Sequence, residues 1–259
     1  MTLYSLTECL KRLRLSGILE SYEVRLSQAR ENALSHNEWL ELLLQDEIQR
    51  RDNTAFIERI KKAKFEQEKT LESFEMARYP LKVQHLIRDL AGGQYLQENK
   101  GLLIVGPTGT GKSHLAQALG HQACRRGKRV RFIRAAQLFR DMHASRADHS
   151  WERALKRFVT PDLLIIDDFG LTALTFTQAE DLYEIIAQRH LHSILIFTSN
   201  RKIEAWIELF PDAAMGNAAL DRLVSQSHAI VLEGDSYRRH GAAKISSLRR
   251  EENSMTVIP

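Results

Sequence analysis

The feature that most constrains this chain is a glycine-rich loop between a short apolar run and an amphipathic run. Residues 106–113 read Gly-Pro-Thr-Gly-Thr-Gly-Lys-Ser, which fits the phosphate-binding pattern G-x-x-x-x-G-K-[ST]. The apolar run at 102–105 is typical of a buried strand, and apolar residues after Lys112 recur at helical spacing. The loop therefore stands between the strand and the helix that the pattern requires, and it predicts a binding site for a nucleotide phosphate.

Each residue type in this loop has a chemical role. Glycines let successive backbone N–H groups point at an anion, and the start of the following helix adds partial positive charge. We expect Lys112 to reach the β and γ phosphates of ATP, and the Ser113 hydroxyl to ligate Mg²⁺. The candidate nucleotide-binding residues are Gly106, Pro107, Thr108, Gly109, Thr110, Gly111, Lys112, Ser113 and His114.

Composition narrows the class of protein. The 259 residues are 43% hydrophobic and 27% charged, as in soluble globular proteins, and suffice for one large core or two modest ones. No apolar run approaches the ~20 residues that span a bilayer, and the first residues lack a signal-peptide pattern. The two cysteines, Cys9 and Cys124, lack metal-ligand spacing and suit a reducing compartment. We therefore expect a cytoplasmic protein without a membrane partner.

The N-terminal part of the chain predicts a small all-helical domain over residues 1–69. Capping-box patterns at Ser5/Glu8 and Ser35/Glu38 each open a helix, and Gly17 is expected to end the first one. Residues 70–80 break the helical pattern, and the Tyr79-Pro80 pair favours extended backbone. We therefore expect a linker at 70–80 and a second domain over 81–259.

The second domain alternates strands and helices. A helix is expected from about residue 82 to Gly92-Gly93, and short apolar strands at 102–105, 130–133, 163–167, 194–198 and 229–232. Short, apolar strands separated by helices predict an α/β fold with a five-stranded parallel sheet, covered by helices on both faces.

Polar side chains follow two of these strands. The run at 163–170 reads "LLIIDDFG" and ends in Asp167 and Asp168. Beside the phosphate loop, Asp167 would lie near Mg²⁺ and Asp168 would polarise the attacking water, whereas the alternative is a pair of loop or helix-capping charges. Ligands of parallel sheets bind beyond the carboxyl ends of strands, so Asn200, after the strand at 194–198, is placed to contact the γ-phosphate or the water.

Two arginines flank the last strand. Arg222 precedes it and Arg238 follows it. A guanidinium aimed at the γ-phosphate would stabilise charge in phosphoryl transfer. Each arginine also has an acid nearby, Asp221 and Asp235, and spacing alone favours ordinary surface ion pairs.

The order of these motifs resembles that of AAA+ ATPases of the helicase-loader clade. Within the clade the chain resembles the IstB family, the helper ATPases of insertion-sequence transposition, over nearly its whole length. "GPTGTGKSHLAQALG", "LLIIDDFG", "TSNRKIEAW", "ALDRLV" and "GDSYR" match the family's motifs. "KKAKFEQEKTLESFE" is similar to the family's link between helical domain and ATPase core, which favours this family over helicase loaders of the DnaC type.

The resemblance implies a P-loop NTPase core of AAA+ type over 81–259 with a short C-terminal tail. It also implies that Arg222 is an arginine finger acting on a neighbouring subunit, and Arg238 a sensor arginine acting on its own nucleotide. ATP between subunits would favour homo-oligomers on duplex DNA, with a transposase as partner and the helical domain as the docking element. Two departures weaken the match: many relatives have Asp-Glu where this chain has Asp167-Asp168, and only 21 residues follow Arg238.

Basic residues suggest where DNA would bind. Residues 1–79 hold 13 basic and 14 acidic side chains, so the net charge of +4 arises beyond them. The run at 125–134 carries six basic residues and no acid, which suits either a polyanion or a solvated turn. The candidate phosphate contacts are Arg125, Arg126, Lys128, Arg153, Lys156 and Arg157.

Two other functions remain open. A helicase loader would share the ATPase motifs but bind single strands and a replicative helicase. A small-molecule P-loop kinase would need an acceptor pocket and gives no role to the segments "ALDRL" and "GDSYR".

Overall fold

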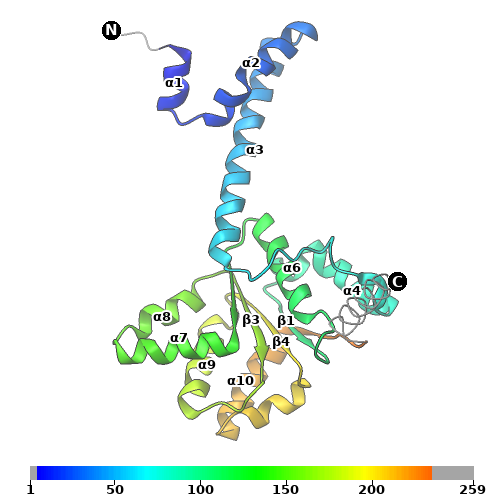
Figure 1. The fold of residues 1–259 in the computed structure, drawn as a ribbon, viewed down its shortest axis with the longest axis vertical. Coiled ribbons are helices and arrows are strands. Elements are labelled where there is room, and N and C mark those ends of the chain that lie inside the picture. Colours follow the sequence, from blue (N-terminus) through cyan, green and yellow to red (C-terminus); the bar gives the residue numbers. More distant parts are fainter. Residues whose placement is uncertain (1–4, 235–259) are drawn as a thin grey trace, which may run out of the picture. The chain divides into compact units, whose positions relative to one another are not determined.

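The structure, a computed structural model, describes residues 5–234. Arg238 lies outside the described residues. The chain divides into two compact units, Met1–Arg59 and Ile60–Pro259 (Figure 1). Helix α3 (His36–Ala63) ends at Ala63, so residues 64–69 are not helical, contrary to expectation. Residues 60–69 and the expected linker at 70–80 group with the sheet-containing unit. No helix in the described part of the chain is long and apolar enough to cross a bilayer.

The first unit is all-helical. Its helices are α1 (Leu6–Arg12), α2 (Ser16–Glu31) and α3 (His36–Ala63), which continues past the division between the units. Both predicted capping boxes are confirmed: Ser5 and Ser35 each exchange hydrogen bonds with the glutamate three residues later. The apolar core is small and consists of Leu10, Ile18 and Leu43, with Tyr22 and Trp39 packed edge to face beside it.

Gly17 does not end the first helix, contrary to the sequence-based expectation. Helix α1 ends at Arg12, and the left-handed Arg14, with φ 56°, turns the chain. Gly17 lies inside the first turn of α2, where an added Cβ would stand 2.7 Å from the Cα of Glu47. The glycine therefore permits the close approach of α2 to α3.

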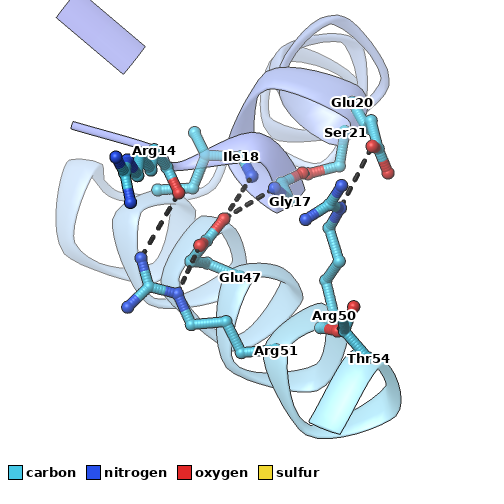
Figure 2. A network of polar contacts seen from close by, with 9 residues as sticks. All are labelled: Arg14, Gly17, Ile18, Glu20, Ser21, Glu47, Arg50, Arg51 and Thr54. Carbon is cyan, nitrogen blue, oxygen red and sulfur yellow. Dashed lines mark hydrogen bonds and ion pairs between the residues drawn. The ribbon is translucent and has the colours of Figure 1, made fainter. Parts of the chain in front are cut away.

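Glu47 supplies the cap that α2 lacks in its own sequence. The N-cap residue, Leu15, has no side chain that accepts a hydrogen bond. The Glu47 carboxylate instead accepts the backbone N–H groups of Gly17, at 2.6 Å, and Ile18, at 3.3 Å, and also binds Arg51 at 2.6 Å (Figure 2). A carboxylate at a helix N-terminus satisfies orphan donors and complements the helix dipole.

The second unit is built on a five-stranded parallel sheet, so the predicted fold class is confirmed. The strand order is β2-β3-β4-β1-β5, and every neighbouring pair is parallel. All five predicted strands are present, as β1 (Gly101–Val105), β2 (Val130–Arg134), β3 (Leu163–Phe169), β4 (Ile194–Ser199) and β5 (Ser227–Val231).

Helices cover both faces of this sheet. On β3, Leu164 and Ile166 join one large core with side chains of α7, α8, α9 and α10. Ile165 points the other way, against Gly120 of α6. The helices of this unit are α4 (Leu81–Gly92), α5 (Gln94–Gln97), α6 (Lys112–Arg125), α7 (Ala135–Ala147), α8 (Trp151–Val159), α9 (Phe176–Arg189) and α10 (Ala213–Ser225), with 3-10 turns η1 (Met76–Arg78) and η2 (Ile203–Leu209).

The pairing of β3 with β4 slips near the carboxyl ends of the two strands. Ile166 pairs with Phe197, but the next pair is Phe169 with Ser199. Two residues of β3, Asp167 and Asp168, therefore lie opposite one residue of β4, Thr198. This arrangement is a β-bulge. Asp168 is the left-handed residue of the bulge, with φ 55°.

Candidate functional site

The phosphate loop joins β1 to α6. At two of its positions only glycine fits, because the backbone is left-handed there and because a side chain would have no room. Gly106 and Gly111 have φ of 150° and 82°, in the region that side chains avoid. A Cβ on Gly106 would also stand 2.1 Å from the Leu232 carbonyl oxygen, and one on Gly111 would stand 2.8 Å from the Tyr79 hydroxyl. The loop is thus packed closely against the backbone of Leu232 and the side chain of Tyr79.

The carbonyl of Pro107 organises the inside of this loop. It accepts hydrogen bonds from the Lys112 ammonium at 2.7 Å and from the Thr110 hydroxyl at 2.8 Å. Lys112, the first residue of α6, is only 7% exposed. Its charge is therefore held over the loop, beside the start of the helix, where an anion is favoured.

A cavity of about 370 Å³ opens over the loop and α6. It brings together predicted residues from three separate motifs of the sequence: Thr108, Gly109, Gly111, Lys112, Ser113, His114, Asp168 and Asn200. Gly106, Pro107 and Thr110 shape the loop beneath it. Lys69, Phe74, Glu75 and Leu171 also line this cavity, and sequence analysis did not find them.

The acidic pair has two different environments. Asp167 is 1% exposed, accepts a hydrogen bond from the Thr198 hydroxyl at 2.5 Å and has the Ser113 hydroxyl nearby. Burial raises the pKa of Asp167 above its ordinary value, and these two hydroxyls only partly oppose that rise. Asp168 is half-buried and reaches the cavity. One carboxylate is thus held in the protein while its neighbour faces the cavity.

The chemistry of Ser113 and Asp167 fits Mg²⁺. Both offer hard oxygen ligands, and the Ser113 hydroxyl lies near enough to the Asp167 carboxylate to lower its pKa. In the described part of the chain no group of three or more His, Cys, Asp and Glu side chains forms a cage for a metal ion. Two protein oxygens fit an ion that completes its shell with water and phosphate oxygens.

Part of the cavity wall comes from residues 65–79, which we call the strap; Lys69, Phe74 and Glu75 line the cavity. Phe74 and Tyr79 stack with ring centroids 5.3 Å apart and planes at 4°. The Tyr79 hydroxyl donates a 2.6 Å hydrogen bond to the Thr110 carbonyl of the phosphate loop. Sequence analysis took part of this segment for a linker, and its one visible signal was aromatic residues within a polar stretch.

The strap is bound along one face of α6. Gln117 accepts the backbone N–H groups of Glu66 and Gln67 at 3.1 and 3.4 Å, and His121 stacks on Phe65 at 4.3 Å. These contacts begin two residues after α3 ends at Ala63. The residues that sequence analysis divided between a helical domain and a linker therefore continue without interruption onto the nucleotide-site helix.

His114 belongs to the same face. Its Nε2 atom lies 3.1 Å from both the Thr70 carbonyl and the Ser73 hydroxyl, and its ring meets the edge of Phe74. Burial lowers the pKa of His114, which favours the neutral ring at pH 7. Its observed contacts are with the strap, and it also borders the cavity.

Arg222 lies away from the cavity of its own chain. It borders a small hollow with Gly101 and Ser227, the first residues of β1 and β5, at the edge of the sheet opposite to the loop. Its guanidinium donates to the Ala218 carbonyl at 2.9 Å and lies over the Tyr183 ring at 5.1 Å. Arg222 is therefore not among the residues that line the nucleotide cavity of its own chain.

The basic run at 125–134 is engaged by neighbouring groups. Arg125 pairs with Glu72 at 3.3 Å, and Arg126 donates to the Ala91 carbonyl at 2.9 Å. Beyond Lys128, which is partly exposed, Arg129 pairs with Asp162 and Arg134 with Glu66. Such exposed pairs contribute little to stability.

The second basic group lies on α8. Arg153, Lys156 and Arg157 are all exposed, and the first two line a hollow of about 690 Å³. Arg146 and His149 also line it. Among the described residues these three side chains form no salt bridge or hydrogen bond, whereas Arg125, Arg126, Arg129 and Arg134 each do.

Comparison with known proteins agrees with this site. The model of a family described as IstB-like ATP binding proteins matches residues 8–244. An ATP-binding protein of an insertion sequence from Mycobacterium tuberculosis is 40% identical, with 90% of this chain and 94% of that protein covered. The ATP-binding protein of insertion sequence IS21 from Pseudomonas aeruginosa is 30% identical, with 91% and 89% covered.

Solved structures share the fold at low sequence identity. The DnaC helicase loader has a TM-score of 0.55 and 22% identity, covering 64% of this chain and 97% of that one. DnaA from Aquifex aeolicus bound to AMPPCP has a TM-score of 0.54 and 22% identity, covering 69% and 54%. The sheet-containing unit thus has the same fold as these two proteins.

Proposed function

The chain belongs to the IstB-like ATP-binding protein family, and on that premise we propose that it hydrolyses ATP, assembles as an oligomer on duplex DNA and assists the transposase of its mobile element in the cytoplasm. The observation that carries the proposal is the cavity over the phosphate loop. There, Lys112, Asp168 and Asn200 converge from the ends of β1, β3 and β4.

Different residues at this site bind the phosphates, hold Mg²⁺ and activate the attacking water. Loop N–H groups and Lys112 bind the β and γ phosphates, and Ser113 with Asp167 holds Mg²⁺, which neutralises phosphate charge when bound. Asp168 accepts a proton from water as the water oxygen bonds to the γ-phosphorus and the bond to the ADP oxygen breaks. Asn200 orients the water or the γ-phosphate.

An oligomer is needed to complete this site. Arg222 lies at the opposite edge of the sheet and serves as the finger for a neighbour's ATP, so ATP joins subunits and hydrolysis loosens them. Arg238 is assigned as the sensor arginine by family resemblance alone, since it lies outside the described residues.

DNA and protein partners use other surfaces. Duplex phosphates meet the exposed cations of α8, with Arg125, Arg126 and Lys128 as further contacts. The first unit docks the transposase or a neighbouring subunit. Leu40, Leu44 and Ile48, spaced by four residues along α3, are 46% to 59% exposed and offer an apolar stripe for this purpose.

Nucleotide assays test the ATPase proposal. Lys112→Ala should lose ATP binding, because it removes the cation that faces the phosphates, whereas Asp168→Asn should bind ATP and lose turnover. Wild-type affinity in the first variant, or wild-type turnover in the second, would contradict the assignment. Phosphate transferred to a small acceptor instead of water would indicate a kinase.

DNA assays separate the proposal from a helicase loader. With a non-hydrolysable ATP analogue, the chain should form oligomers on duplex DNA that can be counted by particle imaging. Assembly on single strands alone, with capture of a replicative helicase, would favour the loader.

A further inference from the structure

We propose that Thr198 is a positioning residue that aims both carboxylates of the acidic pair at the nucleotide site. The inference rests on the proposed ATPase function for its consequence, although the geometry on which it is based is independent of nucleotide. Nothing in the motif spacing singles out Thr198, because the polar triplet at 198–200 was assigned through Asn200.

The Thr198 hydroxyl makes two hydrogen bonds, one to each aspartate. It donates to Asp167 Oδ1 at 2.5 Å and accepts the backbone N–H of Asp168 at 3.0 Å. A hydroxyl has one hydrogen to donate, so the two bonds have fixed and different directions. Thr198 is fully buried, and its β-branched side chain is stiff about χ1, so the hydroxyl has little freedom to turn elsewhere.

The bulge explains why the hydroxyl is needed. In a regular strand, Asp167 and Asp168 would point to opposite faces of the sheet. The extra residue and the left-handed backbone of Asp168 bring both beside the start of α6, where one lies near Ser113 and the other lines the cavity. Because of the bulge, the Asp168 N–H does not bond to a carbonyl of the neighbouring strand. The Thr198 hydroxyl oxygen accepts this hydrogen bond instead.

The neighbouring hydroxyl serves a different purpose. Ser199 is also buried, but its Oγ donates to the Phe169 carbonyl at 2.7 Å, after the bulge, where regular pairing resumes. Among the side chains of β4, Thr198 is thus the one that contacts the acidic pair in the described structure.

Two substitutions at this position separate the hydroxyl from the side-chain volume. Thr198→Val keeps the shape and removes both hydrogen bonds, whereas Thr198→Ser keeps the hydroxyl. Ser145→Ala is the matched control, because it removes a buried hydroxyl that donates to the Met142 carbonyl at 2.7 Å, within α7 and away from the acids. If Thr198→Val does not fold, Thr198→Ala takes its place.

The first measurement needs no nucleotide. Hydrogen exchange of the Asp168 amide should accelerate in Thr198→Val and stay slow in Thr198→Ser and Ser145→Ala. The second measurement is ATP turnover against Mg²⁺ concentration. Turnover in Thr198→Val should fall about 10- to 100-fold and require more Mg²⁺, since supporting groups of metal ligands have effects of this size. ATP affinity without Mg²⁺ should be unchanged, and Thr198→Ser should restore turnover.

The outcomes distinguish the two proposals. Wild-type turnover and Mg²⁺ requirement in a folded Thr198→Val, or the same losses in Ser145→Ala, would overturn the positioning role. If the wild-type chain binds Mg²⁺ and ATP but does not hydrolyse ATP, the ATPase proposal fails. The positioning role is then decided by amide exchange and by the gain in ATP affinity that Mg²⁺ produces in each variant.

Discussion

At the scale of single residues, Tyr79 shows how one hydroxyl ties the strap to the phosphate loop. It is 6% exposed and donates to the carbonyl of Thr110, a loop residue that is itself buried. Removal of the donor leaves that carbonyl without this bond inside the protein, and such losses cost about 1–3 kcal/mol. The conformation of the loop thus depends on a residue 31 positions away in the chain.

Tyr79→Phe should therefore weaken ATP binding several-fold while the fold is kept. The phenyl ring still stacks on Phe74, so the strap remains but the loop is less firmly held. Titration with a fluorescent ATP analogue measures the effect, and Tyr22→Phe, the same change in the first unit, is the control. Equal affinities in all three proteins would show that the loop holds its shape without the tyrosine.

The candidate site was predictable where a motif is local. Lys112 and Ser113 lie in one continuous pattern, and Asp168 and Asn200 end apolar runs, so strand polarity alone brings them together. Tyr79 and Thr198 were missed because their importance lies in hydrogen bonds to distant backbone, which no spacing encodes. Gly17 was misinterpreted for the same reason: its neighbour is Glu47, not the helix end.

At the scale of elements, α2 is capped by a side chain from another helix. Hydrogen bonds from Arg51 and from the N–H groups of Gly17 and Ile18 outweigh burial and hold the pKa of Glu47 below its ordinary value. A group with a lowered pKa in the folded state stabilises that state above its unfolded pKa, and this contribution disappears as the pH falls through the folded value.

Glu47→Gln should accordingly destabilise the start of α2 at neutral pH, by about 1–3 kcal/mol for lost charged hydrogen bonds. The difference from wild type should begin to shrink below about pH 4.3, where the carboxyl protonates in the unfolded chain, and should disappear as the pH falls through the lower pKa of the folded state. Hydrogen exchange of α2 peptides in the full chain reports the effect, with the exposed Glu41→Gln as control. A difference that persists unchanged at low pH would point to packing instead of charge.

The strands of the sheet could be predicted because each is marked by a local run of apolar residues. The boundary between the two units could not be predicted as well from the sequence. Five short apolar runs gave five strands in the expected places. The strap was read as a linker because its sequence has no helical or alternating period, although its backbone and rings are bound along α6. Segments that are ordered by tertiary contacts alone leave little trace in periodicity.

We expect the basic residues of α8 to contribute more to DNA affinity than those of the run at 125–134. Neutralising Arg153, Lys156 and Arg157 together should weaken duplex binding at all sequences and lower the slope of log affinity against log salt by about one per lost phosphate contact. Neutralising Arg125, Arg126 and Lys128 should have a smaller effect, since two of the three already bind protein groups. Filter or anisotropy titrations across salt concentrations measure both slopes, and a larger change from the second set would reverse this ranking.

At the scale of the whole molecule, the position of Arg222 predicts that the active site is shared between chains. Arg222→Ala should bind ATP, since the phosphate loop is intact, and should lose most hydrolysis, because arginine fingers can contribute about 10³-fold or more. Asp168→Asn chains keep the finger and lack the base.

Mixing these two variants should produce composite sites with every part present. ATP turnover above the sum of the separate variants is the expected result, measured at fixed total protein with DNA. If mixed oligomers form, as seen with two different affinity tags, and turnover stays at the sum, then Arg222 acts within its own chain or only supports the fold.

The chain runs from α3 directly into the strap, and this limits where the helical unit could be replaced by that of a related protein. Because Phe74 lines the nucleotide cavity and Tyr79 stacks on it and binds the phosphate loop, a graft that joins a foreign helical unit at residue 70 or 81 would replace part of the nucleotide site together with the helical unit. The interchangeable portion ends near Arg59, inside the continuous helix α3. A graft that joins at this point would leave the strap and its contacts with α6 and the phosphate loop intact.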